Sequence, residues 1–284
     1  MNKQTWPKTL IGIILSILVL VVAQLAAQLT GELLAALSVP AIIVAVIASA
    51  LYPVLAVTGI RLIICKGFKT EKETIRLTRF KPALRWFVIA VIMPVLAIGS
   101  YFFFSGELTR SPLSSQDLIP SIVYSVGFYS IAAGIVEELV FRGVIMGLLE
   151  KKTNFAVACI IPSVLFGLLH IIGNELSFRS IIQLAIAGTI VGILFSLIAK
   201  YTGSIWEGAI VHGIWNAAAY IIAIGNTTSD GSIFTYVLNS RSFLLTGGDF
   251  GMEASVNSIA AYAVIIAAVA VMMAKKKKTA IGNS

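Results

Sequence analysis

Residues 10–27 read LIGIILSILVLVVAQLAA, a stretch that contains no charged side chain. A helix needs roughly 20 mainly apolar residues to cross the ~30 Å hydrocarbon core of a bilayer, and this run approaches that length. It follows Lys3 and Lys8, but it is longer than the apolar part of a usual signal peptide and no clear cleavage pattern follows it. We therefore expect a membrane-spanning helix that is retained as an anchor.

Similar runs recur along the whole chain of 284 residues, which is 58% hydrophobic and only 12% charged. Ordinary soluble domains do not have this composition. The expected spans are Leu10 to Ala27, Val39 to Cys65, Leu84 to Phe104, Pro120 to Leu149, Phe155 to Ile172, Ile181 to Ala199, Ile205 to Ile224 and Ala254 to Ala274. No long linker or repeat divides the chain. The prediction is an all-α polytopic membrane protein, with about eight transmembrane helices in one bundle and residues 1–284 as a single domain.

The net charge of +8 indicates membrane orientation rather than nucleic-acid binding. If the N-terminus is cytoplasmic, 18 of the 21 Lys and Arg fall on or near the cytoplasmic side, and Arg110, Arg179 and Arg241 face out. Positive charge on the cytoplasmic side is the usual pattern of membrane proteins. We expect both termini in the cytoplasm, contact with membrane lipid and no nucleic-acid partner.

A few polar residues interrupt the fourth, fifth and seventh spans. A charge at mid-membrane costs at least ~2.5 kcal/mol, so each needs a partner, a wet cavity or a function. The polar residues of these three spans are Glu137, Glu138, Arg142, His170, Glu207, His212 and Asn216. At 1.5 Å of rise per helical residue, counted from the nearest cytoplasmic turn, four of them reach overlapping depth: Glu137, His170, His212 and Asn216.

Helical spacing separates the roles of the two glutamates. Glu138 and Arg142 are four residues apart, the spacing of an ion pair on one helix face. Glu137 points about 100° away from that face and has no local cation, so it is the better candidate for a general base. Glu207 lies off the face shared by His212 and Asn216, and we assign it no catalytic role.

These residue types suit hydrolysis of a carbonyl bond, and we expect a peptide bond. Glu137 can take a proton from water and return it to a leaving amine. His170 can hold the water, while His212 and Asn216 can donate hydrogen bonds to the oxyanion of a tetrahedral intermediate. The sequence contains no GxSxG or HExxH motif.

The residues leave other mechanisms and functions open. Two His and one Glu are also the ligand types of a catalytic zinc site, so zinc is a candidate cofactor with Glu137, His170 and His212 as ligands. A structural Glu–Arg pair, a binding-only scaffold or immunity protein, and a proton-coupled transporter use similar side chains. The paired interrupted helices that inverted-repeat transporters usually show are absent from the sequence.

Three motifs resemble the CAAX protease and bacteriocin-processing (Abi) family of intramembrane endopeptidases. EExxxR corresponds to Glu137-Glu138-Leu-Val-Phe-Arg142, FxxxH to Phe166-Gly-Leu-Leu-His170, and HxxxN to His212-Gly-Ile-Trp-Asn216. The segment TGSIW from Thr202 to Trp206 also resembles the family's approach to the third motif. The likeness covers about residues 120 to 220, and all three motifs occur in the family's order.

The resemblance implies that Glu137, His170, His212 and Asn216 face a membrane cavity that opens to the cytoplasm, with Glu137 as base. It implies cleavage near the C-terminus of a membrane-associated or lipidated peptide or protein. The family is commonly labelled a metalloprotease, and bacterial relatives are associated with bacteriocin immunity. The short lysine tail and the many Ile and Ala suit a bacterial plasma membrane.

Overall fold

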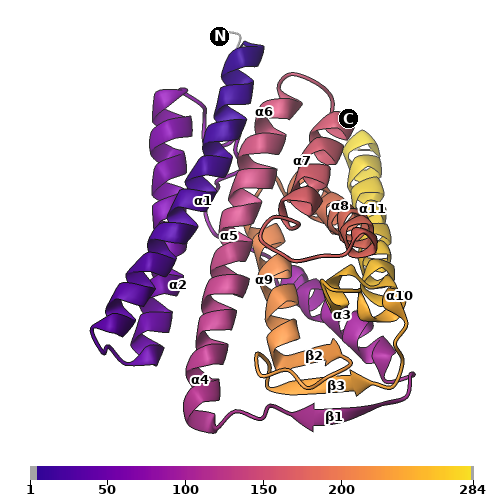
Figure 1. The fold of residues 1–284 in the computed structure, drawn as a ribbon. Coiled ribbons are helices and arrows are strands. Elements are labelled where there is room, and N and C mark those ends of the chain that lie inside the picture. Colours follow the sequence, from indigo (N-terminus) through magenta and orange to yellow (C-terminus); the bar gives the residue numbers. More distant parts are fainter. Residues whose placement is uncertain (1–4, 283–284) are drawn as a thin grey trace.

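A computed structural model describes residues 5–282, so Lys3 lies outside the described residues. The chain is 72% helical, and both termini lie at one end of the molecule (Figure 1). We call this end, which carries the run of four lysines from Lys275 to Lys278, the lysine-rich end. The all-α prediction is confirmed, and every one of the eight predicted spans contains a helix. The helices are α1 (Trp6–Ala36), α2 (Ala41–Ile60) with its extension η1 (Arg61–Gly67), α3 (Leu84–Tyr101), the segments α4 to α6 (Ser115–Glu150), α7 (Phe155–Leu169), α8 (Phe178–Thr202), α9 (Trp206–Ile221) and α11 (Val256–Gly282).

Among the described residues, six helices are long and apolar enough to cross a membrane. Of the two shorter ones, α7 has 15 residues and ends at His170, and α9 has 16 residues with His212 near its middle. The difference has a physical reason. His170 is the C-cap of α7, and the chain then leaves the helix through a turn in which Gly173 has a φ of 83°.

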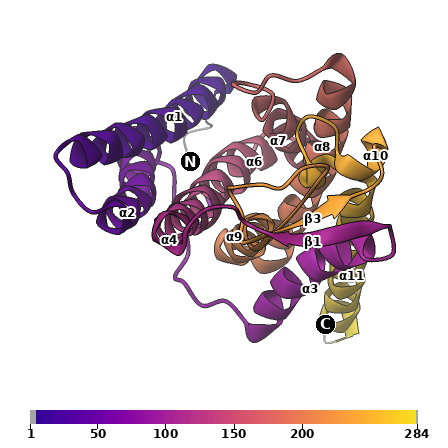
Figure 2. The same cartoon turned by 60° about the horizontal axis from the view of Figure 1, so that its bottom comes forward.

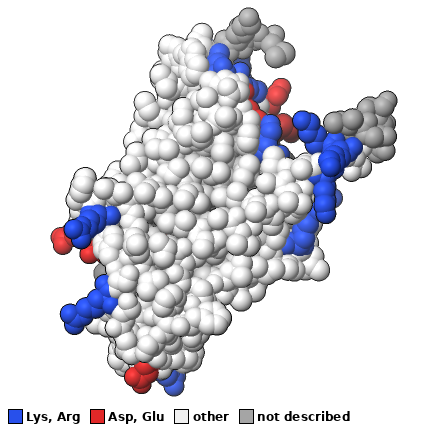
Figure 3. All heavy atoms as spheres, turned by 90° about the vertical axis from the view of Figure 1, so that its right-hand side faces the viewer, with Lys and Arg blue, Asp and Glu red and all other residues white. Residues whose placement is uncertain are grey.

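The helix faces are arranged for lipid rather than for water. On α1 the small residues Ala23, Ala27 and Gly31 are buried, while Leu18 and Leu29 are 50% and 61% exposed. A soluble protein would bury the large side chains instead. Figure 3 shows charged side chains along two opposite edges of the molecule, with a broad uncharged band between them. The molecule is therefore an integral membrane protein by both composition and surface.

The long helix Ser115–Glu150 carries both glutamates. It consists of α4 (Ser115–Tyr124), α5 (Ala133–Glu138) and α6 (Met146–Glu150), joined by the π-helical segments η2 (Ser125–Ala132) and η3 (Leu139–Ile145). A π-helical turn shifts the hydrogen-bond ladder and often marks a functional site. The wider turns therefore flank the Glu137–Glu138 pair on both sides.

A small sheet closes the end opposite the termini, which the sequence did not predict. β3 (Phe234–Leu238) pairs antiparallel with β1 (Gly106–Arg110) and parallel with β2 (Ile222–Gly225), so the strand order is β1-β3-β2. Seen from this end, the sheet lies across the end of α9 (Figure 2). We call this the sheet end. The loop after β3 contains α10 (Phe243–Thr246) and η4 (Met252–Ala254) and leads into α11.

Two glycine pairs with GxxxG spacing, Gly188 with Gly192 and Gly143 with Gly147, mark close contacts, although only the first pair joins two helices. A Cβ on Gly188 of α8 would lie 2.6 Å from the Cα of Gly167 on α7, so α7 and α8 touch backbone to backbone. Gly143 and Gly147 instead face the backbone oxygens of Ile75 and Thr74 in the loop before α3.

Replacing Gly188 with alanine should therefore separate α7 from α8 and lower the thermal unfolding temperature in detergent. Overpacking of this kind typically costs about 1–3 kcal/mol of unfolding free energy. Gly99→Ala in α3 is the matched control, because a Cβ there meets no atom within 4 Å. Equal melting temperatures for the two variants would contradict the close α7–α8 contact.

Candidate active site

Arg142 and Glu138 form a fully buried ion pair, as their spacing predicts. Arg142 Nη1 donates to Glu138 Oε1 at 2.8 Å, and both side chains are 0% exposed. Arg142 Nη2 also donates to the carbonyl oxygen of Gly192 at 3.1 Å. The guanidinium carbon lies 4.6 Å from the ring centre of Phe166 and 5.1 Å from that of Phe195. The pair therefore ties the long helix to α7 and α8 beside the site.

Glu138 has a second partner in His212, which places this imidazole between two carboxylates. His212 Nδ1 is 3.3 Å from Glu138 Oε1, and its Nε2 is 3.7 Å from Glu137 Oε2. Ionised Glu138 only accepts hydrogen bonds, so Nδ1 of His212 is the donor. Phe195 stacks on the imidazole at 4.7 Å between ring centres and 16° between planes, which fixes the orientation of the ring.

Glu137 is not bonded to Arg142 and faces a cavity. Its side chain is 19% exposed, whereas that of Glu138 is 0% exposed. The buried Glu137 Oε2 has no hydrogen-bond partner among the described residues. The two adjacent carboxylates therefore differ as the helical spacing predicts: Glu138 is neutralised by Arg142, and Glu137 is left available.

His170 is fixed in one tautomer by the end of α7. Its Nδ1 lies 2.7 Å from the carbonyl oxygen of Phe166, and a carbonyl can only accept. Nδ1 therefore carries the hydrogen, and in the neutral ring Nε2 presents a lone pair. Phe166 also packs at the edge of His212, with ring centres 5.7 Å apart, so one aromatic side chain contacts both imidazoles.

Asn216 is held by the π-helical turn of η2. Its Nδ2 donates to the carbonyl oxygen of Tyr129 at 3.1 Å. An amide group has two N–H donors, so the second N–H and the oxygen remain available. The position of Asn216 thus depends on the long helix as well as on α9.

Two adjoining cavities surround these residues. The polar cavity, of about 200 Å³, is lined by Gln24, Tyr52, Tyr129, Glu137 and Tyr220, among others. The apolar cavity, of about 50 Å³, is lined mainly by Leu184, Ala187, Val191, Phe195, Trp215 and Phe250, and His212 also faces it. Three residues line both cavities, namely His170, Asn216 and Glu253. The four predicted site residues therefore meet around one connected space.

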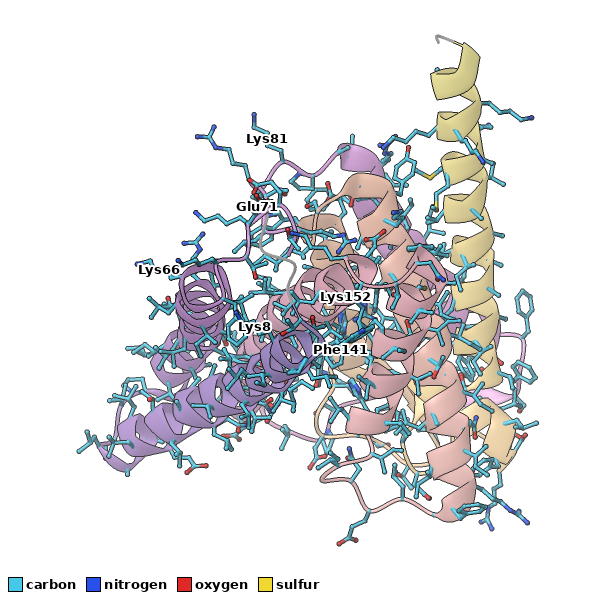
Figure 4. All side chains as sticks on the ribbon, turned by 90° about the horizontal axis from the view of Figure 1, so that it is seen from above. Lys8, Lys66, Glu71, Lys81, Phe141 and Lys152 are labelled. Atoms are coloured by element: carbon cyan, nitrogen blue, oxygen red, sulfur yellow. The ribbon has the colours of Figure 1, made fainter. Side chains whose placement is uncertain are left out.

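The lysine-rich end of the site is closed by protein. Residues 68–83 form a loop in which Ile75 is buried, and the guanidinium of Arg76 donates to the carbonyl oxygen of Arg142 at 3.0 Å and pairs with Glu150. The Arg76 carbonyl accepts from Ile205 N at 3.2 Å. Viewed onto this end, Lys8, Lys66, Lys81 and Lys152 come from different segments and Phe141 lies among the central helices (Figure 4).

The cavities extend from Glu137 toward the sheet end instead. Tyr129 precedes Glu137 by eight residues on the long helix, and Phe250 and Glu253 belong to the loop after the sheet. The lining residues therefore favour an opening toward the sheet end over the expected opening toward the lysine-rich end. The physical reason is the loop of residues 68–83, whose contacts with Arg142 and Ile205 a helix-by-helix depth estimate does not include.

Glu253 is a site residue that the sequence analysis missed. Its carboxylate has no hydrogen bond or ion pair among the described residues, although its backbone oxygen accepts from Tyr262 Oη at 3.0 Å. Burial raises the pKa of Glu253 above the usual range of a carboxyl group. The nearby imidazoles of His170 and His212 act to lower this pKa, and Glu137 acts to raise it. No motif marks this residue, because it lies in a loop of irregular sequence just before α11.

The loop that carries Glu253 is tied to the start of α8. Asp249 accepts from the Ser177 backbone N–H at 2.8 Å and from Ser180 Oγ at 2.7 Å, and these bonds lower the pKa of Asp249. Gly247, Gly248 and Gly251 have positive φ angles of 65° to 97°, which side-chain-bearing residues rarely adopt. The loop therefore has a specific conformation that places Phe250 and Glu253 against His170.

The arrangement does not form a zinc site. Zinc needs three or four ligand atoms about 2 Å from one point. Among the described residues, no three His, Cys, Asp or Glu side chains gather closely enough. The carboxylates and imidazoles around the cavities are groups that can donate and accept protons.

Glu207 remains outside both cavities, in the first turn of α9, in agreement with its lack of an assigned role. It is buried, and its Oε2 has no hydrogen-bond partner among the described residues. This makes it a useful control for Glu137.

A helical membrane protein with buried carboxylates, imidazoles and an amide around one cavity fits the general class of intramembrane hydrolases. Comparison with known proteins narrows this class. The model of the family described as Type II CAAX prenyl endopeptidase Rce1-like matches residues 118–218. A Bacillus subtilis (strain 168) protein named "Putative membrane peptidase YdiL" is 27% identical over 187 residues, which cover 62% of this chain and 73% of that protein.

These matches confirm the resemblance to the CAAX protease and bacteriocin-processing family. The matched segment of the family model contains all three motifs, from Glu137 to Asn216. It does not contain Glu253 or the last span. The general class supported by the matches is a membrane peptidase of the CAAX type.

Proposed function

We propose that this protein is an intramembrane endopeptidase that hydrolyses a peptide bond of a membrane-associated or lipidated substrate with water activated by Glu137. One observation carries the proposal. Glu137 Oε2 and His212 Nε2 are 3.7 Å apart, on a space that His170 and Asn216 also line. Base, water holder and oxyanion donors thus line two adjoining cavities that share His170 and Asn216.

The water is held between Glu137 and His170. Nε2 of His170 accepts one hydrogen of the water, and Glu137 removes the other as the oxygen attacks the carbonyl carbon. The carbonyl oxygen becomes the oxyanion. Glu137 then passes its proton to the leaving nitrogen, the C–N bond breaks, and the products are a carboxylic acid and an amine.

The oxyanion is stabilised from α9. Because Nδ1 of His212 donates to Glu138, a contact from Nε2 requires the imidazolium form of the ring. The second N–H of Asn216 supplies the other donor. Glu138, Arg142 and Phe166 act by positioning His212 and His170.

The same proposal assigns an orientation and a location. With the lysine-rich end in the cytoplasm of a bacterial cell, both termini are cytoplasmic, and the cavities reach the site from the outer half of the membrane. The bond to be cut then approaches from the sheet end or from within the bilayer. Cysteine labelling of Ser229→Cys, near β3, from outside intact cells tests this orientation, and protection of that cysteine would contradict it.

Activity is tested with a fluorogenic peptide anchored in lipid nanodiscs by an acyl or prenyl chain. The purified protein should cut the peptide, and a metal chelator should leave the rate unchanged within about twofold, because no step uses a metal. A rate that the chelator abolishes and zinc restores would contradict the metal-free mechanism. Absence of any cleavage by folded protein would favour a scaffold or immunity role.

A further inference from the structure

Two carboxylates line the cavities, and one of them, Glu137, lies beside the imidazole of His212. Glu137 and Glu253 line them, and no lysine or arginine does so among the described residues. Arg142 is already paired with Glu138, and both side chains are 0% exposed. His212 is the one imidazole paired to carboxylates, and it serves both Glu137 and Glu138.

Glu253 stands where the two cavities adjoin. It shares that position with His170 and Asn216, while Glu137 faces only the polar cavity and His212 only the apolar one. A peptide that passes through both cavities must therefore pass Glu253 near its reacting bond. The residue sits on η4, outside the membrane-spanning helices, and its loop is held by Asp249 on Ser177 and Ser180.

An unpaired carboxylate in such a place has an energetic cost. A charged group taken out of water without a partner loses several kcal/mol of solvation, and a cation at contact distance restores much of it. No described lysine or arginine pairs with Glu253, and the imidazoles of His170 and His212 are the groups whose positive charge can act on it. An approaching lysine or arginine of the substrate would supply such a cation, and a substrate carboxylate would be repelled.

We propose that Glu253 is a specificity-determining residue, which selects substrates with a lysine or arginine side chain close to the scissile bond. This inference rests on the proposed peptidase function and adds the substrate class. It also disfavours substrates whose free C-terminal carboxylate enters the cavity, and so favours internal bonds in basic segments over bonds at a chain end.

The test uses nanodisc-anchored fluorogenic peptides that differ at one position, scanned over the three residues on each side of the cleaved bond. Lysine, uncharged norleucine of similar length, and glutamate are compared at that position. For the wild-type protein we expect kcat/KM at least tenfold higher for the lysine peptide than for the glutamate peptide at the responsive position. The preference should persist at 0.15 M salt, because a partly buried charge is weakly screened.

Glu253→Gln should bring the lysine-to-glutamate ratio of kcat/KM close to one. Glu253→Lys should reverse the preference. Glu107→Gln is the matched control, because it removes one negative charge from the exposed strand β1 at the same end and lines neither cavity. A ratio that Glu253→Gln leaves unchanged would overturn the inference.

A binding measurement separates this inference from the proposed function. Equilibrium binding of the same peptides is measured by fluorescence anisotropy on Glu137→Gln protein, with and without Glu253→Gln. Tighter binding of the lysine peptide, lost in the double variant, supports the role of Glu253 even if no peptide is cut. Equal binding of lysine and glutamate peptides contradicts it, whether or not cleavage occurs.

Discussion

Glu137→Gln is expected to lower the cleavage rate at least ~10²-fold, because the amide cannot take a proton from the attacking water. The substitution keeps the shape of the side chain, and the buried Oε2 that it replaces has no hydrogen-bond partner among the described residues. The fold should therefore survive. KM should change little, since the loss lies in the chemical step. Initial rates on the anchored peptide measure both quantities.

Glu207→Gln is the control for this result. It changes a buried glutamate to glutamine on α9, outside both cavities, and should retain activity within about threefold. A wild-type rate for Glu137→Gln, or equal losses in the two variants, would rule out Glu137 as the base.

The second large effect is expected from Arg142→Met, which leaves Glu138 buried without its cation. Removing one partner of a buried ion pair typically costs about 3–5 kcal/mol. Both side chains are 0% exposed, and Arg142 also donates to the carbonyl oxygen of Gly192 in α8. We therefore expect a loss of unfolding free energy within this range. Thermal unfolding in detergent should show a large drop in melting temperature.

The double variant Glu138→Gln/Arg142→Met separates charge from packing. It removes the unpaired charge as well, and should recover part of the lost stability. It should not recover activity, because His212 loses the carboxylate that holds its Nδ1. A double variant less stable than Arg142→Met alone would contradict the ion-pair account.

Most of the helical framework and the partners within helices could be predicted from the sequence. Hydropathy defines the spans, because length and apolar composition decide what can cross a bilayer. The four-residue spacing of Glu138 and Arg142 predicts their pair, since both lie on one helix. Counting the helical rise from the nearest turn also placed Glu137, His170, His212 and Asn216 at overlapping depth in the membrane. The count works because these turns lie at the same end of the molecule.

Features that depend on irregular segments could not be predicted in this way. The sheet requires β1 to meet β3 across more than a hundred residues, and neither strand has a strong pattern. Glu253 reaches the site through a glycine-rich loop whose positive φ angles set its course. The closed lysine-rich end depends on Arg76, which binds a backbone oxygen of the long helix. In each case the deciding contact is long-range and involves backbone atoms.

The most direct test of the central claim is the mass spectrum of protein and peptide after a single turnover in oxygen-18 water, with the protein in excess over an anchored peptide. Water activated by Glu137 predicts one heavy oxygen in the new carboxyl group and no change in the mass of the protein at any time. An uncut peptide beside folded protein, or a protein carrying an acyl adduct, would contradict it.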